Sequence, residues 1–344
     1  MLGRITETDP LPPPAVVALA ASAGGVEALS IVVAGLPADL PAAVFVVLHV
    51  APIGPSVLPA IIGRYAHLKA HHATDGEAVV AGEVYVAPPD YHLLVEDGLV
   101  RVLQGPRENG NRPAADPLFR SVAASYGKRA AGVVLSGSLD DGTAGLASIK
   151  DAGGLTVVQD PEEAAFPGMP MNAIANVEPD CIASLYDIPG ILARFAEEVS
   201  ATGREHPNEI AAVTHDDELV DPPSEFTCPD CGGTLWFVGE QPLQLRCRVG
   251  HSFSTESFDV GKKDAIENAL WAGIVALEER ADLSRRLLRR LPPTSGGLSA
   301  KRHRKAIEQS ERGADTLRQL AAELIGPLTP FEQHPEGTEG DGED

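Results

Sequence analysis

The sequence predicts an α/β fold with a doubly wound, mostly parallel sheet and a β-hairpin insertion, followed by a small metal-binding module and an α-helical hairpin. Short apolar runs alternate with amphipathic stretches through residues 15–199, and several runs end in a polar turn that contains glycine. Unbroken apolar runs are typical of strands buried on both faces, and repeated alternation of strand and helix indicates a parallel, Rossmann-like sheet. A Cys/His cluster and near-heptad apolar spacing in the last third predict the two smaller parts.

Size and composition support this division. The chain has 344 residues, 44% of them hydrophobic, which is enough for one large domain and a smaller one. No apolar stretch approaches the length of about 18 residues that indicates a transmembrane helix. The first residues, MLGRITETDPLPPP, are polar and rich in proline rather than signal-like, so we expect a cytoplasmic protein without membrane insertion.

The first strand leads into a serine turn. Residues 1–14 are predicted to form a flexible lead-in and 15–21, AVVALAA, a buried strand. The chain then passes through Ser22 and the pair Gly24-Gly25 into a helix. Glycines allow a sharp turn, and the N–H groups at a helix start favour developing negative charge, so Ser22 stands where a nucleophile would be placed.

The following elements continue the alternation. A second buried strand over 42–50 delivers His49 at its carboxyl end, and short strands over 73–102 include a hairpin around the turn EDG. A helix over 115–130 precedes another apolar strand, whose polar turn carries Asp141. A strand, LTVVQD, a proline-rich loop, PEEAAFPGMPMNAI, and a last helix, IPGILARFAEEV, complete the domain.

The domain boundaries follow from shifts in composition. In chain order we expect a large α/β domain over 15–199, an acidic linker over 200–225, a zinc-ribbon-like module over 226–260, a helical hairpin over 261–328 and a disordered acidic tail over 329–344.

The helical hairpin carries a local basic charge. Apolar residues in 262–291 and 301–326 recur at near-heptad spacing, which predicts an antiparallel hairpin closed within one chain or by self-association across two. Between Leu283 and Ile307 there are eight Lys or Arg and no acid. The net charge of −22 disfavours nucleic-acid binding by the whole protein, so we expect the basic tip to hold an acidic protein partner.

Three of the four cysteines gather with a histidine in two short pairs. Cys228 and Cys231 are followed, after fifteen residues, by Cys247 and His251. Thiolates and an imidazole at this spacing favour tetrahedral Zn²⁺ over reduced, unliganded cysteines or disulfides. Because the protein supplies all four ligands, the predicted zinc is structural, and no cofactor is expected for catalysis.

Three polar residues, Ser22, His49 and Asp141, each follow a separate apolar strand. Ligands of open α/β sheets bind at the carboxyl ends of the strands, so these side chains are expected to converge at one edge. A serine, a histidine that accepts its proton and a carboxylate that orients the histidine form the set needed for acyl transfer. The pattern alone leaves open that Ser22 and Asp141 cap helices and that His49 is structural.

Several stretches carry a resemblance to a known family. They read ALAASAGGVEAL, VVLHVAP, GEVYVAPPDYHLLV, RPAADPLFRSVA, GVVLSGSLDDGTAGL and GGLTVVQDPEEAAFPGMPMNAI. Over about residues 15–195 the chain resembles the catalytic domain of the CheB-type chemotaxis methylesterases, the protein-glutamate methylesterases. The resemblance implies that Ser22 is the nucleophile, His49 the base and Asp141 the orienting acid, and that residues 15–199 form a catalytic domain. The implied reaction is hydrolysis of glutamyl methyl esters on a chemoreceptor, often with deamidation of glutamine.

The chain departs from the family pattern at three points. Ala23 follows the expected nucleophile where threonine is common, and Ser138 stands where methionine is common. Both positions lie near the expected oxyanion site, where backbone donors do not depend on the side chain. A receiver domain usually precedes the catalytic domain in the family, and here we expect none.

The leading hypothesis is therefore a serine esterase that acts on methylated glutamates of a receptor or receptor-like signalling protein, with the zinc module and basic hairpin positioning the partner. The alternative is a catalytically weak regulatory or interaction protein that retains the fold. Appended Cys/His segments with helical tails also occur in some methylesterase-like proteins.

Other polar residues are weighed for structural rather than catalytic roles. Asp140 is expected at the solvent side of its turn, and the histidines 67, 71 and 72 at the surface. For His92 a cleft-lining role and a structural one stay open. Arg112 and Asp116 flank a loop, and an ion pair that shapes the loop is favoured over substrate binding.

Overall fold

A computed structural model describes residues 13–52, 56–202, 222–239, 242–291 and 297–325. The expected lead-in over 1–14, most of the acidic linker and the tail over 329–344 lie largely or wholly outside these ranges. Among the described residues, no helix combines the length and apolar character that crossing a bilayer requires.

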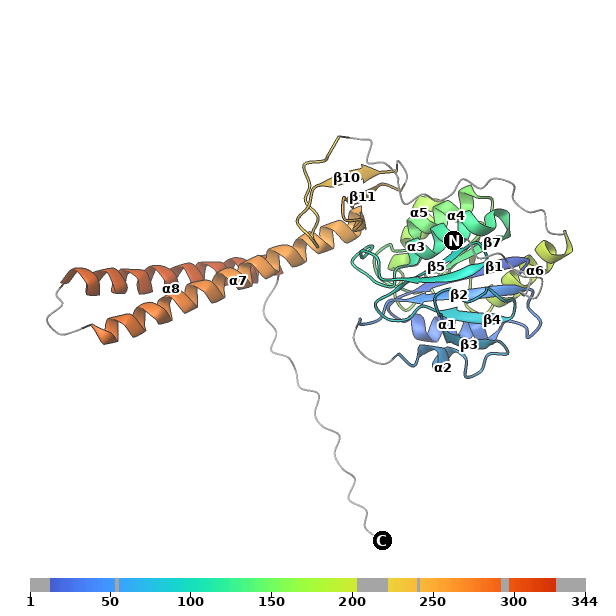
Figure 1. Ribbon diagram of the computed structural model, residues 1–344, viewed down its shortest axis with the longest axis horizontal. Coiled ribbons are helices and arrows are strands. Elements are labelled where there is room, and N and C mark those ends of the chain that lie inside the picture. Colours follow the sequence, from blue (N-terminus) through green and yellow to red (C-terminus); the bar gives the residue numbers. More distant parts are fainter. Residues whose placement is uncertain (1–12, 53–55, 203–221, 240–241, 292–296, 326–344) are drawn as a thin grey trace, which may run out of the picture. The chain divides into compact units, whose positions relative to one another are not determined.

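A seven-stranded sheet organises the large domain, and all of its neighbouring strands pair in parallel (Figure 1). In spatial order the strands are β3 (Lys69–His72), β4 (Glu83–Val86), β2 (Ala42–Leu48), β1 (Ala15–Ala21), β7 (Ala130–Val134), β8 (Leu155–Gln159) and β9 (Cys181–Ala183). The strands β1 and β2 are buried along their whole length, as their unbroken apolar runs predict.

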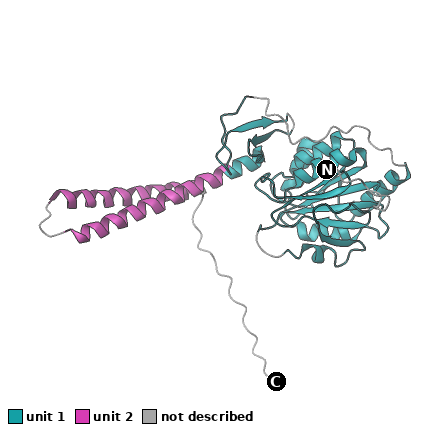
Figure 2. Cartoon of the chain, in the orientation of Figure 1, with its two compact units in different colours: residues 1–261 teal, residues 262–344 magenta. Residues whose placement is uncertain are grey.

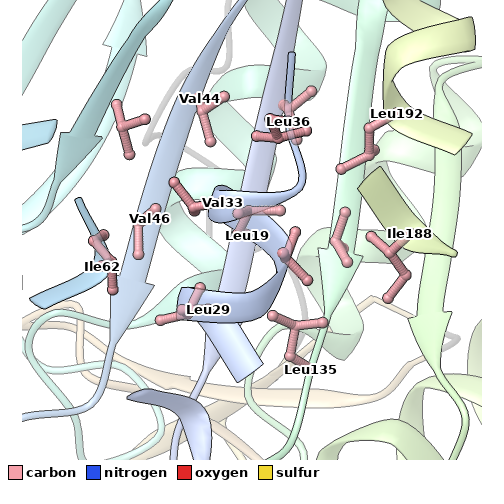
Figure 3. Close-up of a cluster of buried hydrophobic side chains, with 14 of the residues drawn as sticks. Leu19, Leu29, Val33, Leu36, Val44, Val46, Ile62, Leu135, Ile188 and Leu192 are labelled. Carbon is pink, nitrogen blue, oxygen red and sulfur yellow. The ribbon is translucent and has the colours of Figure 1, made fainter. Parts of the chain in front are cut away.

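Helices cover both faces of this sheet, so the predicted doubly wound α/β architecture is confirmed. Their bounds are α1 (Gly25–Ala34), α2 (Leu58–Ile62), α3 (Ala115–Tyr126), the short 3₁₀ helix η1 (Gly127–Arg129), α4 (Thr143–Asp151), α5 (Gly168–Val177) and α6 (Ile188–Ala201). Successive side chains of β1 point alternately to the two faces of the sheet. Leu19 packs with α1 and α6, as Leu29 and Leu192 show in Figure 3, while Ala18 joins the core beneath α3 to α5.

A hairpin interrupts the alternation, as predicted. Strands β5 (His92–Glu96) and β6 (Leu99–Leu103) pair antiparallel around Asp97 and Gly98, which have φ values of 52° and 75°. Two successive residues with positive φ are typical of the tight turns that match strand twist.

Two sequence expectations for this domain are wrong. The stretch PGMPMNAI, expected within a loop, forms the start of α5, because Pro170 lies in the first turn, where a missing N–H costs no helical hydrogen bond. The β-rich insertion is also shorter than expected, because β4 joins the main sheet between β3 and β2.

The Cys/His module, residues 226–260, contains a small antiparallel sheet of β10 (Leu235–Val238), β11 (Gln244–Cys247) and β12 (Ser252–Ser254). Its core is small and includes two of the cysteines: Cys228, Leu235, Leu245, Cys247 and Phe253. So few apolar side chains make a metal a natural source of stability for this module.

The chain divides into two compact units, residues 1–261 and 262–344 (Figure 2). Most of helix α7 (Thr255–Arg290) and helix α8 (Gly297–Ile325) form the second unit, and their buried residues there include Ile274, Ala281, Ala314 and Ala321. Ion pairs Arg285–Glu311 and Arg318–Glu278 join the two helices, as the predicted hairpin requires. Helix α7 begins earlier than the sequence pattern indicates, because Ser254 Oγ accepts the Ser257 N–H at 3.0 Å and caps it.

Candidate active site

Ser22 lies at the turn between β1 and α1. Its backbone N–H donates to Ser136 O at 2.9 Å, which ties the turn to the end of the neighbouring strand β7. Gly24 has φ 72°, and a Cβ there would lie only 2.8 Å from Ser136 Oγ and 2.9 Å from Ala165 Cβ. A glycine is therefore needed at position 24 for both conformation and space.

His49 follows β2 and connects the two other predicted site residues. The Ser22 O–H donates to His49 Nδ1 at 3.1 Å, and His49 Nε2–H donates to Asp141 Oδ2 at 2.7 Å. Because the ionised carboxylate of Asp141 can only accept, the network assigns the hydrogen to Nε2 and leaves Nδ1 free to accept from serine. The sequence-predicted Ser22, His49 and Asp141 are thus brought together in one hydrogen-bonded chain.

Asp141 is buried, with 2% of its surface exposed. Oδ2 also accepts the Ala115 N–H at 2.6 Å, and Oδ1 accepts from Asn109 Nδ2 at 2.9 Å. Burial by itself raises the pKa of Asp141, but the hydrogen bonds from His49, Ala115 and Asn109 outweigh it and hold the pKa below 3.8. The carboxylate is therefore ionised at neutral pH, as a partner for an imidazolium must be.

The start of α1 supplies candidate donors for an oxyanion. Within the described ranges, the backbone N–H groups of Ser22 and Gly25 have carbonyl acceptors, whereas those of Ala23 and Gly24 have none. Ala23 is half-buried and Ser138 exposed. The two free N–H groups lie at a helix N-terminus, where negative charge is favoured.

Two buried polar residues beside Asp141 escaped prediction as site residues. Asn109 donates from Nδ2 to both Asp141 and Asp116, and Asp116 Oδ1 accepts the Gly145 N–H at 2.7 Å. Burial, followed by the charge of Asp141, raises the pKa of Asp116 to about 8. Neither residue directly follows a strand, so position at a strand end does not identify them. The sequence signal that marks the loop of Asn109 is the polar run ENGNR, which Pro113 and Ala114 separate from α3.

The structure revises two expectations about neighbouring charges. Arg112 pairs with Asp90 at 2.7 Å rather than with Asp116. Asp140 is not a freely solvated turn residue, because it accepts the Ser254 O–H at 2.7 Å and burial raises its pKa to about 6.

The histidines outside the site have structural surroundings. His92 is buried between Pro106 O, 2.8 Å from Nε2, and the Ala114 N–H, which settles its open role in favour of a structural one. His71 is not the surface residue expected, since it lies on β3 beside Glu77 and the ring of Tyr85.

The cysteine ligand set fits a tetrahedral metal. The ligand atoms of Cys228, Cys231, Cys247 and His251 all lie within 4.8 Å of one another. Cys231 Sγ and Cys247 Sγ are 3.8 Å apart, and His251 Nδ1 lies 3.5 Å from Cys247 Sγ and 3.7 Å from Cys228 Sγ. Tetrahedral Zn²⁺ with ordinary bond lengths requires S–S and S–N separations of about 3.75 and 3.55 Å. The four residues can therefore hold zinc.

Replacing Cys228 by serine is expected to reduce bound zinc from about one ion per chain to a small fraction of that value, because a buried thiolate ligand is lost. The module should also become sensitive to proteolysis. Metal content after gel filtration measures the first effect. Cys181→Ser is the matched control, since Cys181 lies on β9 outside the cluster. Full zinc in the Cys228 variant would contradict the assignment.

The buried carboxyls predict a pH-dependent stability. The raised pKa values of Asp116, about 8, and Asp140, about 6, mean that the folded chain keeps protons that the unfolded chain releases. Their stabilising effect is present below about pH 4 and is lost as pH rises through about 6 and then 8. Asp141, with its lowered pKa, has the opposite sign: its stabilising effect is present at neutral pH and is lost as the pH falls through the lowered pKa.

The free energy of unfolding is therefore expected to fall by a few kcal/mol between about pH 5 and about pH 8.5. Urea unfolding at constant ionic strength measures it. Asp116→Asn cannot ionise at this position, so its curve should be flatter whatever its absolute stability. Equal slopes for the two proteins would contradict this origin of the effect.

A parallel α/β domain whose sheet edge carries a hydrogen-bonded Ser–His–Asp chain has the arrangement of a serine hydrolase. Comparison of the sequence with known protein families identifies which family of hydrolases this domain resembles. The CheB methylesterase family matches residues 17–192, about half of the sequence, and the chain belongs to this family.

Similar proteins extend this finding. The chain is 38% identical over 177 residues to protein-glutamate methylesterase/protein-glutamine glutaminase 2 of Anaeromyxobacter dehalogenans, covering 52% of each chain. A Xanthomonas oryzae protein of the same name is 41% identical over 171 residues, 48% of this chain and 46% of that one. The chain thus matches only about half the length of these relatives.

Shorter relatives are matched almost completely. A Leptospira interrogans protein is 35% identical over 180 residues, which cover 52% of this chain and 93% of that protein. The crystal structure of the Thermotoga maritima CheB methylesterase catalytic domain aligns with a TM-score of 0.50 and 32% identity, over 52% of this chain and 97% of that one.

Proposed function

We propose that this protein is a serine esterase that hydrolyses methyl esters of glutamate side chains on a chemoreceptor or receptor-like signalling protein. The hydrogen-bonded chain from Ser22 through His49 to Asp141 is the observation that carries the proposal. It lies within the region that matches the CheB methylesterase family.

In the proposed reaction, Ser22 Oγ attacks the ester carbonyl carbon while His49 Nδ1 takes the hydroxyl proton. The carbonyl oxygen becomes an oxyanion, which the N–H groups of Ala23 and Gly24 stabilise. His49 then returns its proton to the departing methoxide, and methanol leaves an acyl-enzyme on Ser22. Water, deprotonated by His49, hydrolyses the acyl-enzyme to glutamate.

Asp141 orients His49 and stabilises its protonated form throughout. A glutamine side chain presents a carbonyl at the same distance from the receptor backbone, so deamidation with release of ammonia is a second proposed activity. The four-ligand Cys/His site leaves no open coordination position, so zinc there would have a structural role.

The proposed partner is a methylated receptor in the cytoplasm. The second unit would help to recruit it through the basic hairpin tip, which includes Arg286, Arg289 and Arg304. The hairpin also leaves apolar side chains exposed, among them Leu283, Leu298 and Leu324, and these suit self-association.

The test is methanol release from a methyl-esterified receptor fragment incubated with the full chain, compared with the same fragment alone. Catalysed methanol release supports the function. A simple acyl ester assayed in parallel separates substrate choice from catalysis. Turnover of that ester alone would revise the receptor substrate, and no turnover of either would favour an interaction protein that retains the fold.

A further inference from the structure

Asn109 uses the full hydrogen-bonding capacity of its buried side-chain amide. Nδ2 donates to Asp141 Oδ1 and to Asp116 Oδ2, both at 2.9 Å. Oδ1 accepts the Ser254 N–H and the Ser257 O–H, also both at 2.9 Å. Only this orientation gives donors to the carboxyls and an acceptor to the serines, so the contacts on one side fix those on the other.

Both groups that donate to Asn109 Oδ1 come from the Cys/His module. The Asn109 backbone N–H also donates to Ser252 O at 2.8 Å, so three of its contacts come from residues 252–257. This segment follows the proposed ligand His251 directly and includes β12 and the first residues of α7. Metal binding at His251 would therefore fix the strand that holds the amide.

A second contact reaches the same turn. Ser254 Oγ donates to Asp140, the residue before Asp141, at 2.7 Å and at the same time caps α7. The module thus contacts the turn of the proposed acid both directly and through Asn109. Without the module's donors, Asn109 Oδ1 would be a buried acceptor without partners, and the amide would reorient away from Asp141.

We propose that Asn109 is a positioning residue for the Asp141 carboxylate and that zinc in the Cys/His module holds Asn109 in its working orientation, so that zinc occupancy sets the turnover rate. The inference rests on the proposed esterase function. The module then has a role in the reaction without touching the substrate.

Two variants break the two sides of the amide separately. Asn109→Asp keeps an oxygen that can accept from the serines but removes the N–H groups that donate to Asp141. Ser257→Ala keeps Asn109 but removes the hydroxyl that donates to Asn109 Oδ1. Both are expected to lower kcat about 10- to 100-fold, with KM within about twofold, because a hydrogen bond to a charged group is lost or loosened. Rates are normalised to active sites titrated with a phosphonate, so that unfolded protein does not count.

Ser252→Ala is the matched control. Ser252 is buried in β12, the strand that contacts Asn109, and within the described ranges its hydroxyl has no hydrogen-bond partner, while its backbone contacts survive the substitution. Its kcat should stay within about twofold of wild type. If Asn109 only anchored the loop to the module, Asn109→Asp would retain wild-type kcat, and that result would overturn the inference.

Removal of zinc supplies a readout without substrate. After chelation and dialysis of the full chain, hydrogen exchange of the peptide covering 104–112 should become at least about tenfold faster, while that of β1 stays slow. Addition of Zn²⁺ alone should restore both protection and kcat. If the wild-type protein is active but neither its hydrogen exchange nor its kcat changes with zinc, this inference alone is overturned. If the protein releases no methanol, the proposed function is overturned as well.

Discussion

Replacing Ser22 by alanine is expected to lower kcat for methanol release by at least about a thousandfold while leaving the fold intact. The substitution removes the Oγ that donates to His49 Nδ1 at 3.1 Å, so no acyl-enzyme can form. The oxyanion donors and His49 remain, and slow attack by water is all that they can support. Initial rates with saturating methylated receptor fragment measure the effect, and labelling by a fluorophosphonate should disappear from the peptide that contains residue 22.

Ser30→Ala is the matched control for this loss. Ser30 lies on α1, close to the serine turn, and its Oγ donates only to Val26 O within its own helix. Its kcat should stay within about twofold of wild type. If Ser22→Ala kept more than about a tenth of the wild-type rate, Ser22 would not be the nucleophile. Equal losses in both variants would point to damage to α1 instead.

Much of the candidate site could be predicted from the sequence because its residues lie at or just after the carboxyl ends of strands. Ser22 and His49 directly follow strands that are unbroken apolar runs, and Asp141 follows the similar run AGVVLSG by a short turn. In a parallel sheet the carboxyl ends of such strands meet at one edge, so topology brings the residues together without knowledge of side-chain packing. The alternation of apolar runs and amphipathic stretches also predicted most strands and helices along the chain, but not α2, β3, α5 or β9, nor the inclusion of β4 in the main sheet.

Residues placed by long-range contacts were beyond that reasoning. Asn109 lies in an irregular loop, and its partners Ser254 and Ser257 are more than a hundred residues away in the sequence. The sequence favours an ion pair between Arg112 and Asp116, which flank one loop, but Arg112 pairs with Asp90 instead. Which polar groups are buried together depends on the packing of whole elements, and local pattern does not encode it.

Replacing Asp141 by asparagine is expected to lower kcat by about ten-thousandfold, the other large effect. The amide has one acceptor for a site that needs two. In one orientation the amide oxygen of the variant faces His49 and Ala115, and its NH₂ group then opposes the NH₂ group of Asn109. In the other orientation the NH₂ group faces His49, so the imidazole must accept at Nε2 and carry its hydrogen on Nδ1. An Nδ1–H opposite Ser22 cannot take the serine proton, so the base is lost.

The measurement is kcat under saturating substrate, together with thermal unfolding to show that the variant folds. Asp151→Asn, an exposed carboxyl at the end of α4, is the matched control and should keep wild-type activity. A folded Asp141 variant with more than about a tenth of the wild-type kcat would remove Asp141 from the reaction. We expect the Asp141 variant to react slowly with a fluorophosphonate although Ser22 is intact. Slow labelling would show that the carboxylate acts through His49, because the serine is present but not activated.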